Sequence, residues 1–446
     1  MNRSNDEEDK SRIVQDAVLG ILLKYDKERA SLRSILRTFR LETSYTLEIY
    51  SEIQYISMGI IQHLNTIDFI LSRSTRRGSF GDISPRFRAM LRIALFQSRW
   101  QQISPERLID LFADENSQMQ SILKEAISKD LDQLIVRLPR NERTSLKLSH
   151  PSFIVDTLFS NMSESEALSL MDSNNSQGTA YLRRNRLRTT AVDPIDEISS
   201  IGVNLEQDRT VPGLFHVLSG MDLLVQSGPF LNSEVLIQDK ASVLTVHALS
   251  PQPEEITWDA CAAPGMKTQL IWEMMQQKGK LIATELNTKR LNIAKERSHA
   301  LGTNTVEWMQ GDASQCPITG ANKILIDAPC SSTGMLRTHP SYKWRLNKRY
   351  LFSIMAIQNK ILEGIISRYS LHPGTEIVYA TCSILPHEGE NQIDTILNKY
   401  DVELLDIPGI ERAGYPDFDC TKKVRRLFPH SDNTDGFFIA KMRIKH

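Results

Sequence analysis

Residues 256–268 read Ile-Thr-Trp-Asp-Ala-Cys-Ala-Ala-Pro-Gly-Met-Lys-Thr, a short apolar run followed by a turn rich in small residues. The run predicts a buried strand, Ile256–Trp258, and Gly265 lets the backbone pass close to a ligand before a helix opens. The turn lacks the dinucleotide pattern GxGxxG. It is not a P-loop either, because Met266 separates Gly265 from Lys267. The stretch therefore favours a strand–turn–helix unit of an α/β sheet.

The same alternation of strand and helix patterns continues from about Leu236 to the C-terminus. The further strands that we expect are Leu281–Thr284, Thr305–Met309, Lys323–Ile326, Glu376–Tyr379, Val402–Leu405 and Phe437–Met442. Helical patterns such as Lys267–Gln277 and Thr288–Ala300 lie between most of them. This order implies a doubly wound α/β domain over residues 236–446, Rossmann-like, with a seven-stranded and mostly parallel sheet. Ligands of such sheets bind at the carboxyl ends of the strands.

Carboxylates follow the second and third of these strands. Glu285 lies 20 residues beyond Gly265, and a carboxylate at about that distance typically accepts hydrogen bonds from ribose hydroxyls. Asp312, in Gly311-Asp312-Ala313, adds a carboxylate to the same edge. Without a pyrophosphate clamp, these parts fit a nucleoside-bearing ligand such as S-adenosylmethionine.

Two cysteines and an aspartate follow the fourth and fifth strands. Asp327-Ala328-Pro329-Cys330 ends one strand, and Thr381-Cys382 ends the next. A lone cysteine after a strand is usually an inert core residue, but two at neighbouring strand ends beside a ligand pocket favour a chemical role. A disulfide is the alternative. The absence of a secretory signal and of cysteines in the first 260 residues favours a reducing compartment and free thiols.

Composition excludes several classes of protein. Hydrophobic residues are 41% of the 446, enough to bury a core, and the length suggests about three domains. The net charge of -1 excludes a uniformly basic nucleic-acid-coating protein, although a local basic face is compatible with it. No apolar run reaches the roughly 18 residues of a membrane span. No CxxC pair suggests a structural zinc site, and no metal is expected. We expect a cytoplasmic protein.

The first half of the chain has a different pattern. We expect a disordered polar tail over 1–12 and an all-helical domain over 13–135, where apolar residues recur at helical spacing. That periodicity also suits a mere packing module. Residues 150–235 alternate short helix and strand signals and predict a small α/β subdomain. Its strand Tyr-Leu-Arg-Arg-Asn-Arg-Leu-Arg, residues 181–188, carries arginines that suit phosphates. A solvated basic strand is the alternative reading.

Five motifs carry a family resemblance: CAAPGMKT (261–268), GDA (311–313), DAPCSSTG (327–334), YATCSILPHEGENQ (379–392) and DGFFIAKM (435–442). Together they resemble RNA cytosine-C5 methyltransferases of the Fmu/Sun type. The nearest likeness is the ribosomal RNA cytosine-C5 methyltransferase B group, whose members carry a helical NusB-like domain before the catalytic one. The match covers about 236–443, and residues 150–235 are similar to the family's RNA-binding subdomain less specifically. Met266 stands where the family usually has a second glycine, and Glu285 where it usually has aspartate.

The resemblance implies S-adenosylmethionine-dependent methylation of cytosine C5 in RNA. It makes Cys382 the nucleophile, places Asp327 on the cytosine edge and gives Cys330 a part in product release. Addition of a thiolate to C6 makes the otherwise poor nucleophile C5 electron-rich, and an acid near N3 absorbs the charge. Chemistry alone does not decide which of the two cysteines is the nucleophile, because DNA enzymes of similar chemistry use the cysteine that follows proline. Lys267 either orients Asp327 or the base, or is a plain surface lysine.

The resemblance also implies binding residues. The expected cofactor contacts are Cys261, Ala262, Ala263, Pro264, Gly265, Met266, Lys267, Glu285, Asp312 and Asp327. The target cytosine must be flipped or single-stranded to be reached. The expected RNA-backbone contacts are Arg183, Arg184, Arg186, Arg188, Lys343 and Arg345, with Lys348 and Arg349, and with Arg73, Arg76, Arg77, Arg86, Arg88 and Arg92 on the helical domain. Glu388 and Glu390 are expected on the N-terminal face of a helix.

The helical first domain favours ribosomal RNA as the substrate. We expect RNA as the partner, and we expect the protein to be a monomer. A transfer RNA methyltransferase is one alternative. A non-catalytic RNA-binding ribosome assembly factor is another, and a NusB-like transcription module with an appended domain is a third. The presence of both Cys330 and Cys382 argues against the non-catalytic alternatives.

Overall fold

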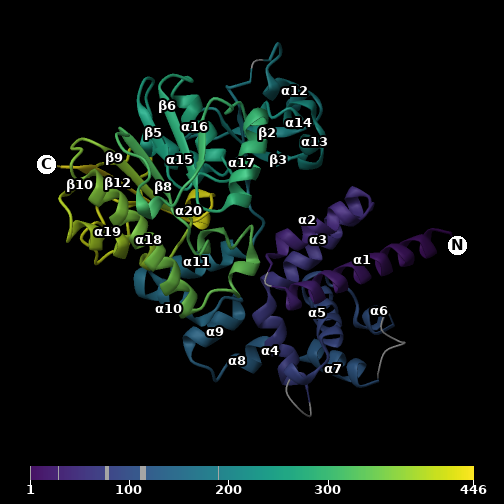
Figure 1. Ribbon diagram of the computed structural model, residues 1–446. Coiled ribbons are helices and arrows are strands. Elements are labelled where there is room, and N and C mark those ends of the chain that lie inside the picture. The colour runs from purple at the N-terminus through teal and green to yellow at the C-terminus, as the bar shows by residue number, and fades with distance from the viewer. Residues whose placement is uncertain (1, 29, 76–79, 111–116, 189, 446) are drawn as a thin grey trace. The chain divides into compact units, whose positions relative to one another are not determined.

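The computed structural model describes residues 2–28, 30–75, 80–110, 117–188 and 190–445. The chain divides into two compact units (Figure 1). The helical unit comprises residues 1–175 and 338–345, and the α/β unit comprises residues 176–337 and 346–446. Among the described helices, none is both long and apolar enough to cross a membrane.

The helical unit is built from short and medium helices whose first turns are capped. Ser31, Thr46 and Ser84 each accept a hydrogen bond from a backbone N–H of the first helical turn, which satisfies a donor that the helix leaves open. The helices are α1 (Asn2–Lys27), α2 (Leu32–Glu42), α3 (Leu47–Gln62), α4 (Leu64–Ser74), η1 (Phe80–Asp82), α5 (Pro85–Trp100), α6 (Pro105–Asp110), α7 (Ser117–Ser128), α8 (Leu131–Ile135), α9 (Arg140–Lys147), α10 (Ser152–Asn161) and α11 (Glu164–Asn174).

Two boundaries differ from the sequence expectation. The expected disordered tail is wrong from Asn2 onward, because α1 begins there. Further along this helix, Lys10 forms a 2.6 Å ion pair with Glu48 of α3. The helical unit also continues past residue 135 to Asn175.

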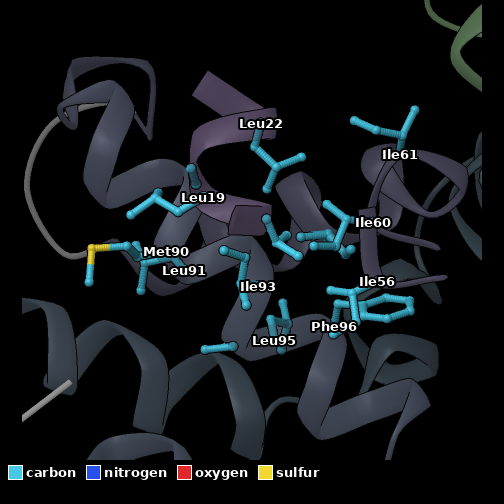
Figure 2. Packing of buried hydrophobic residues seen from close by; sticks show 14 of the residues in the cluster. Leu19, Leu22, Ile56, Ile60, Ile61, Met90, Leu91, Ile93, Leu95 and Phe96 are labelled. Carbon is cyan, nitrogen blue, oxygen red and sulfur yellow. The ribbon is translucent and has the colours of Figure 1, made fainter. Parts of the chain in front are cut away.

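The core of the helical unit is aliphatic (Figure 2). Leu22, Ile56 and Ile60 meet residues of α5, including Leu91 and Phe96, in one buried cluster. Gly59 lies against the Phe96 ring, where an added Cβ would be 2.2 Å from a ring carbon. The glycine therefore allows α3 and α5 to approach closely.

A segment from the second half of the chain completes this unit. Residues 338–345, with η4 (Pro340–Tyr342), belong to it. The Trp344 indole packs against its core and donates to the Ile61 carbonyl at 2.6 Å. The Lys343 Nζ donates to the carbonyls of Gln62 (3.2 Å) and Ser149 (3.0 Å) and to Asn175 Oδ1 (2.6 Å).

Lys343 is therefore buried among protein oxygens, which contradicts its expected place on an RNA-binding surface. Its residue exposure is 0%, and burial holds the pKa of its ammonium well below the ordinary value. Its Nζ donates to oxygens inside the helical unit, because residues 338–345 fold into that unit.

The α/β unit begins with a small antiparallel sheet of order β2-β3-β1-β4. Its strands are β1 (Ala180–Arg184), β2 (Asn204–Gln207), β3 (Leu214–Ser219) and β4 (Val235–Ile237), with α12 (Pro194–Ser200), α13 (Met221–Gln226) and α14 (Gly228–Leu231). A small core that includes Leu182, Ile198 and Leu224 joins sheet and helices. The small α/β subdomain thus starts at about residue 180, while residues 150–175 belong to the helical unit.

The main sheet has the order β10-β12-β9-β8-β5-β6-β7, and β11 pairs with β12. Its strands are β5 (Ile256–Asp259), β6 (Lys280–Glu285), β7 (Glu307–Gln310), β8 (Lys323–Asp327), β9 (Glu376–Thr381), β10 (Val402–Leu404), β11 (Arg425–Leu427) and β12 (Phe437–Ile444). Strands β5 to β9 pair in parallel, and β12 pairs antiparallel with β9, β10 and β11. The seven expected strands are all present, which confirms the Rossmann-like class; β11 was not expected.

Helices accompany the main sheet: α15 (Lys240–Leu249), α16 (Met266–Met274), α17 (Thr288–Leu301), α18 (Lys348–Tyr369), α19 (Glu390–Leu397) and α20 (Pro429–Asp432), with the short turns η2 (Ala313–Gln315), η3 (Thr333–Met335) and η5 (Pro386–Glu388). Because β5, β6, β8 and β9 run in one direction, Asp259, Glu285, Asp327 and Thr381 end them at the same edge. Cys261, Glu285, Asp327 and Cys382, which the sequence singled out, end or follow these four strands.

Candidate active site

A cavity of about 1130 Å³ opens at the carboxyl ends of the parallel strands. The loops after β5, β6, β7, β8 and β9 line it, and α18 supplies another side. The lining residues include Ala260, Cys261, Ala263, Glu285, Leu286, Gly311, Asp312, Asp327, Cys330, Ile357 and Cys382. The structure thus brings together the carboxylates and both strand-end cysteines that the sequence singled out.

One part of the cavity fits a nucleoside. Glu285 accepts a hydrogen bond from the Asn287 backbone N–H at 2.9 Å and lies 3.3 Å from Arg290, which fixes its carboxylate. Asp312 accepts from the Ser314 N–H at 2.9 Å. Both carboxylates line the cavity and can accept from hydroxyl or amine groups, while Leu286 and Ile357 offer apolar contact to a flat ring. These residues fit the nucleoside part of S-adenosylmethionine.

The turn after β5 is shaped by Gly265. Its φ is +99°, and an added Cβ would lie 3.2 Å from the Trp308 ring, so any other residue would be strained here. Met266 begins α16 and is not among the residues with positive φ, so its side chain is accommodated. The departure from a second glycine therefore leaves the turn intact.

The expected cofactor residues divide into two groups. Cys261 and Ala263 line the cavity, together with the three carboxylates already named. Residues 262 and 264–267 form the turn and the start of α16 without lining it. Burial raises the pKa of the Cys261 thiol far above its ordinary value, so this side chain stays neutral.

The two strand-end cysteines touch. The Sγ atoms of Cys330 and Cys382 are 3.1 Å apart, and both residues are partly exposed. The hydrogen bond with Cys382, together with burial, raises the pKa of Cys330 well above its ordinary value. Cys330 therefore stays a thiol and can donate a hydrogen bond to Cys382. All five cysteines are free.

Lys267 is held against Asp327. Its Nζ donates to Asp327 Oδ2 at 2.7 Å, and its side chain is 13% exposed, so it is no plain surface lysine. Burial by itself would lower the pKa of Lys267, but the nearby Asp327 carboxylate, helped by Cys382, raises it. Lys267 is thus a buried cation that faces both the carboxylate and the nucleophile candidate.

The expected RNA-binding arginines differ in how exposed their side chains are. Arg183 is 4% exposed and donates to Gln238 at 2.7 Å, to Glu273 at 3.3 Å and to Gln269, which contradicts a role on the RNA backbone. Side chains alternate faces along a strand, so Arg183 points into the core while its neighbour Arg184 points out.

The other arginines of this segment are more accessible. Arg184 pairs with Asp193, and Arg188 donates to the carbonyls of residues 299 and 300. The Arg186 side chain is 72% exposed. On the helical unit, Arg92 contradicts the expectation, because its side chain is 8% exposed and bound to Asp26 and Asp68. Arg76 and Arg77 lie outside the described residues.

Sequence reasoning missed a buried polar cluster beneath the cysteines. Glu388 and Glu390, expected on the N-terminal face of a helix, are both 0% exposed. Glu390 pairs at 2.5 Å with the buried Arg426, and Glu388 binds the serines that follow the two cysteines. The sequence signal that could have revealed this cluster is the serine that follows each of the two cysteines, Ser331 and Ser383. Among the described residues, no group of three or more His, Cys, Asp or Glu could hold a metal ion.

The chain is similar to known RNA methyltransferases. A family model described as 16S rRNA methyltransferase RsmB/F matches residues 246–443. The ribosomal RNA small subunit methyltransferase B of Serratia proteamaculans is 31% identical over 316 residues, which are 70% of this chain and 69% of that protein. The human 28S rRNA (cytosine(4447)-C(5))-methyltransferase is 29% identical over 66% of this chain, which spans only 38% of the human protein.

A solved structure shares the whole fold. The crystal structure of PH0851 has a TM-score of 0.78 and 23% sequence identity, and the match covers 97% of this chain and 98% of that one. At this identity the likeness shows the fold alone. It includes both the helical unit and the α/β unit.

Proposed function

The chain belongs to the RsmB/F family of rRNA methyltransferases, and from this premise we propose that it transfers a methyl group from S-adenosylmethionine to C5 of a cytosine in ribosomal RNA. The observation that carries the proposal is the contact of two thiols, 3.1 Å apart, in one cavity with Asp327, whose carboxylate accepts a hydrogen bond from Lys267 behind the cavity wall. A covalent route to C5 methylation needs such a nucleophile and such a polar group within reach of one base. We further propose a monomer that acts in the cytoplasm, where thiols stay reduced.

In this proposal Cys382 activates the base. Its thiolate bonds to C6 of a flipped cytosine, the C5–C6 double bond opens, and a proton from solvent adds at N3. Asp327, oriented by Lys267, binds the N3 edge, and Lys267 also steadies negative charge on Cys382. S-adenosylmethionine, held by residues such as Glu285 and Asp312, supplies an electrophilic methyl group to C5.

Cys330 then acts on release. Solvent takes up the C5 proton and the N3 proton, the double bond re-forms, and the bond between Cys382 and C6 breaks with sulfur leaving as the thiolate. Cys330 is a thiol in contact with that sulfur, so it donates a hydrogen bond to the departing thiolate. This assigns the nucleophile to Cys382 and the release step to Cys330.

The two roles give opposite phenotypes. We expect Cys330→Ala to accumulate a covalent RNA adduct, because the sulfur leaves less readily, and Cys382→Ala to form none. Both variants should transfer less labelled methyl from S-adenosylmethionine to ribosomal RNA than the native protein. Denaturing gel electrophoresis of the protein after incubation with RNA detects the adduct. An adduct in Cys382→Ala and none in Cys330→Ala would reverse the assignment.

The substrate class has its own test. Bisulfite sequencing of RNA from cells that lack the protein should show loss of a 5-methylcytosine in ribosomal RNA. A loss confined to transfer RNA would replace the proposed substrate while keeping the chemistry. Absence of methyl transfer to any cellular RNA would refute the activity.

A further inference from the structure

We infer that Glu388 is a positioning residue whose single buried carboxylate fixes the distance between the two cysteine loops. The use of that distance in catalysis depends on the proposed function, whereas the geometry itself does not. Glu388 closes η5, directly after β9 and the Cys382 turn, and its side chain is 0% exposed.

The carboxylate binds both loops at once. Oε2 accepts from the hydroxyls of Ser331 and Ser383, each at 2.5 Å, and these serines follow Cys330 and Cys382 in the chain. Oε1 accepts from the Ser331 backbone N–H at 2.7 Å. One side chain therefore spans the gap between the Pro-Cys-Ser and Thr-Cys-Ser motifs.

A further donor ties the same carboxylate to a third element. The Gln358 amide on α18 donates to Glu388 Oε1 at 3.0 Å and to the Pro329 carbonyl at 2.9 Å. Pro329 precedes Cys330, so that loop is held on both sides of its cysteine. The Glu388 carbonyl also accepts from the Tyr379 hydroxyl at 2.9 Å, which fixes η5 to β9.

Thr333 adds a cross-link between the loops. Its hydroxyl lies 3.1 Å from that of Ser331 and 3.0 Å from that of Ser383, and it accepts from the Ile384 N–H at 3.2 Å. The Gly334 N–H donates to the Cys382 carbonyl at 2.9 Å. Polar contacts that converge on Glu388 thus hold the two loops together. The two cysteines themselves are partly exposed and line the cavity.

The choice of a glutamate has a physical reason. Four donors converge on it, and a carboxylate is the side chain that accepts at both oxygens. Hydrogen bonds to a charged acceptor are also stronger than neutral ones, so they hold the loops more tightly. Aspartate is one methylene shorter, so it cannot keep its contacts to both loops in place.

The substitution Glu388→Gln keeps the length of the side chain. Its oxygen can replace Oε1 toward the fixed donors of Ser331 and Gln358, while its amide faces the two serine hydroxyls, which can rotate to accept. A role in positioning therefore predicts that glutamine preserves the distance between the sulfurs and aspartate does not. A role of the negative charge alone predicts the reverse.

The test measures the distance between the sulfurs in the full-length protein, without RNA or S-adenosylmethionine. Diamide oxidises the two thiols to a disulfide; the thiols lose two electrons and two protons, and diamide becomes the hydrazine. We expect Cys330–Cys382 cross-linking in Glu388→Gln to stay within about twofold of the native rate, and in Glu388→Asp to slow at least about tenfold, the effect of losing a hydrogen bond to a charged group. Mass spectrometry of the peptides quantifies the disulfide.

Two further variants keep the test decisive. Ser383→Ala removes one tie without touching Glu388, and it should slow cross-linking in the same direction even if Glu388→Asp does not fold. Glu376→Gln, a carboxylate at the other end of β9, is the matched control: it should lower stability but leave the cross-linking rate unchanged. Circular dichroism verifies the fold of each variant.

The outcomes separate the inference from the proposed function. Native cross-linking rates in both Glu388→Asp and Ser383→Ala would overturn the positioning role, whatever the methylation assay shows. A slowing that Glu388→Asp, Ser383→Ala and Glu376→Gln share equally would also overturn it, because it would report general loosening. Slowed cross-linking in the first two, in a protein that transfers no methyl group, would uphold the geometry and reject the proposed activity.

Discussion

Single residues around Cys330 and Cys382 give the two touching sulfurs different surroundings. Two thiolates 3.1 Å apart would repel, so one sulfur must keep its proton. The hydrogen bond to Cys382 and burial favour the protonated form of Cys330, and Glu388 adds negative charge on the same side. Lys267 instead faces Cys382. In the proposed mechanism, this asymmetry favours Cys382 as the nucleophile.

This asymmetry predicts a change in thiol reactivity. In Cys382→Ala the largest cause of the raised pKa of Cys330 disappears, so its thiolate should form at lower pH than in the native protein. The rate of Cys330 alkylation by iodoacetamide, followed by mass spectrometry across pH 7 to 10, should rise at neutral pH by about tenfold for each unit that the pKa falls. Cys316, whose pKa burial raises to about 11, is the internal control. An unchanged Cys330 profile would contradict the assignment.

Lys267 gives a second prediction at this scale. Lys267→Met removes the 2.7 Å contact that orients Asp327, so we expect methyl transfer to lose about 100-fold in kcat, the size of a typical acid–base contribution. Because Lys267 does not line the cavity, KM for S-adenosylmethionine should change little. Steady-state kinetics measure both quantities. Lys289→Met, at an exposed lysine of α17, is the control; equal losses in both variants would contradict the role.

Sequence spacing predicted the residues at the sheet edge but not how deep each side chain lies. Cys330, Cys382 and Asp327 follow strand ends, and they meet at the cavity because parallel strands share an edge. Arg183 and Glu388 were misjudged because their partners come from distant parts of the chain. A charged residue in a motif looks solvated until those partners are known.

Strands β5 to β9 and β12 were predictable as elements because each is a short apolar run. Strand β11 was not, since Arg425-Arg426-Leu427 looks like a surface turn. The Arg426 side chain is 0% exposed and is neutralised by Glu390, so a buried ion pair replaces the apolar signal. A strand of this kind can be recognised only when its ion-pair partner is known, which here is Glu390 of α19.

The start of β9 provides a prediction for acid stability. Burial would raise the pKa of Glu376, but Arg443, Lys441 and Lys323 lower it from 4.5 to about 2. A carboxyl whose pKa falls on folding stabilises the protein above pH 4.5, and this stability is lost as the pH falls toward 2. Glu376→Gln should therefore lower the free energy of unfolding by about 2 kcal/mol at pH 7 and progressively less below pH 4.5.

Urea denaturation at several pH values measures this difference. Glu403→Gln, on the neighbouring strand β10, is a control whose carboxylate is exposed. A difference between native protein and Glu376→Gln that stays constant from pH 7 to pH 2.5 would show that the ion pairs of Glu376 do not supply the stability.

At the scale of the whole molecule, residues 338–345 link the folding of the two units. The segment is covalently part of the α/β half of the sequence but fills the helical unit with Trp344 and Lys343. Unit boundaries were not predictable for this reason: composition and periodicity describe neighbours in sequence, and this contact joins residues almost 200 positions apart, 149 and 343.

Lys343→Met tests that link. The substitution leaves the carbonyls of Gln62 and Ser149 and the Asn175 amide oxygen without their donor, so the helical unit should lose about 3 kcal/mol of stability. In differential scanning calorimetry we expect an earlier transition to separate from that of the α/β unit. Lys348→Met, at an exposed position just beyond the segment, should leave the trace unchanged. A native trace for Lys343→Met would contradict the prediction.

The passage of the chain through the helical unit twice has a consequence for protein engineering. The backbone changes unit after residues 175, 337 and 345. A truncation at residue 175 would cut only the first of these junctions and would leave the helical unit without Trp344 and Lys343. Transplanting the helical unit onto another catalytic domain would therefore require moving residues 338–345 with it.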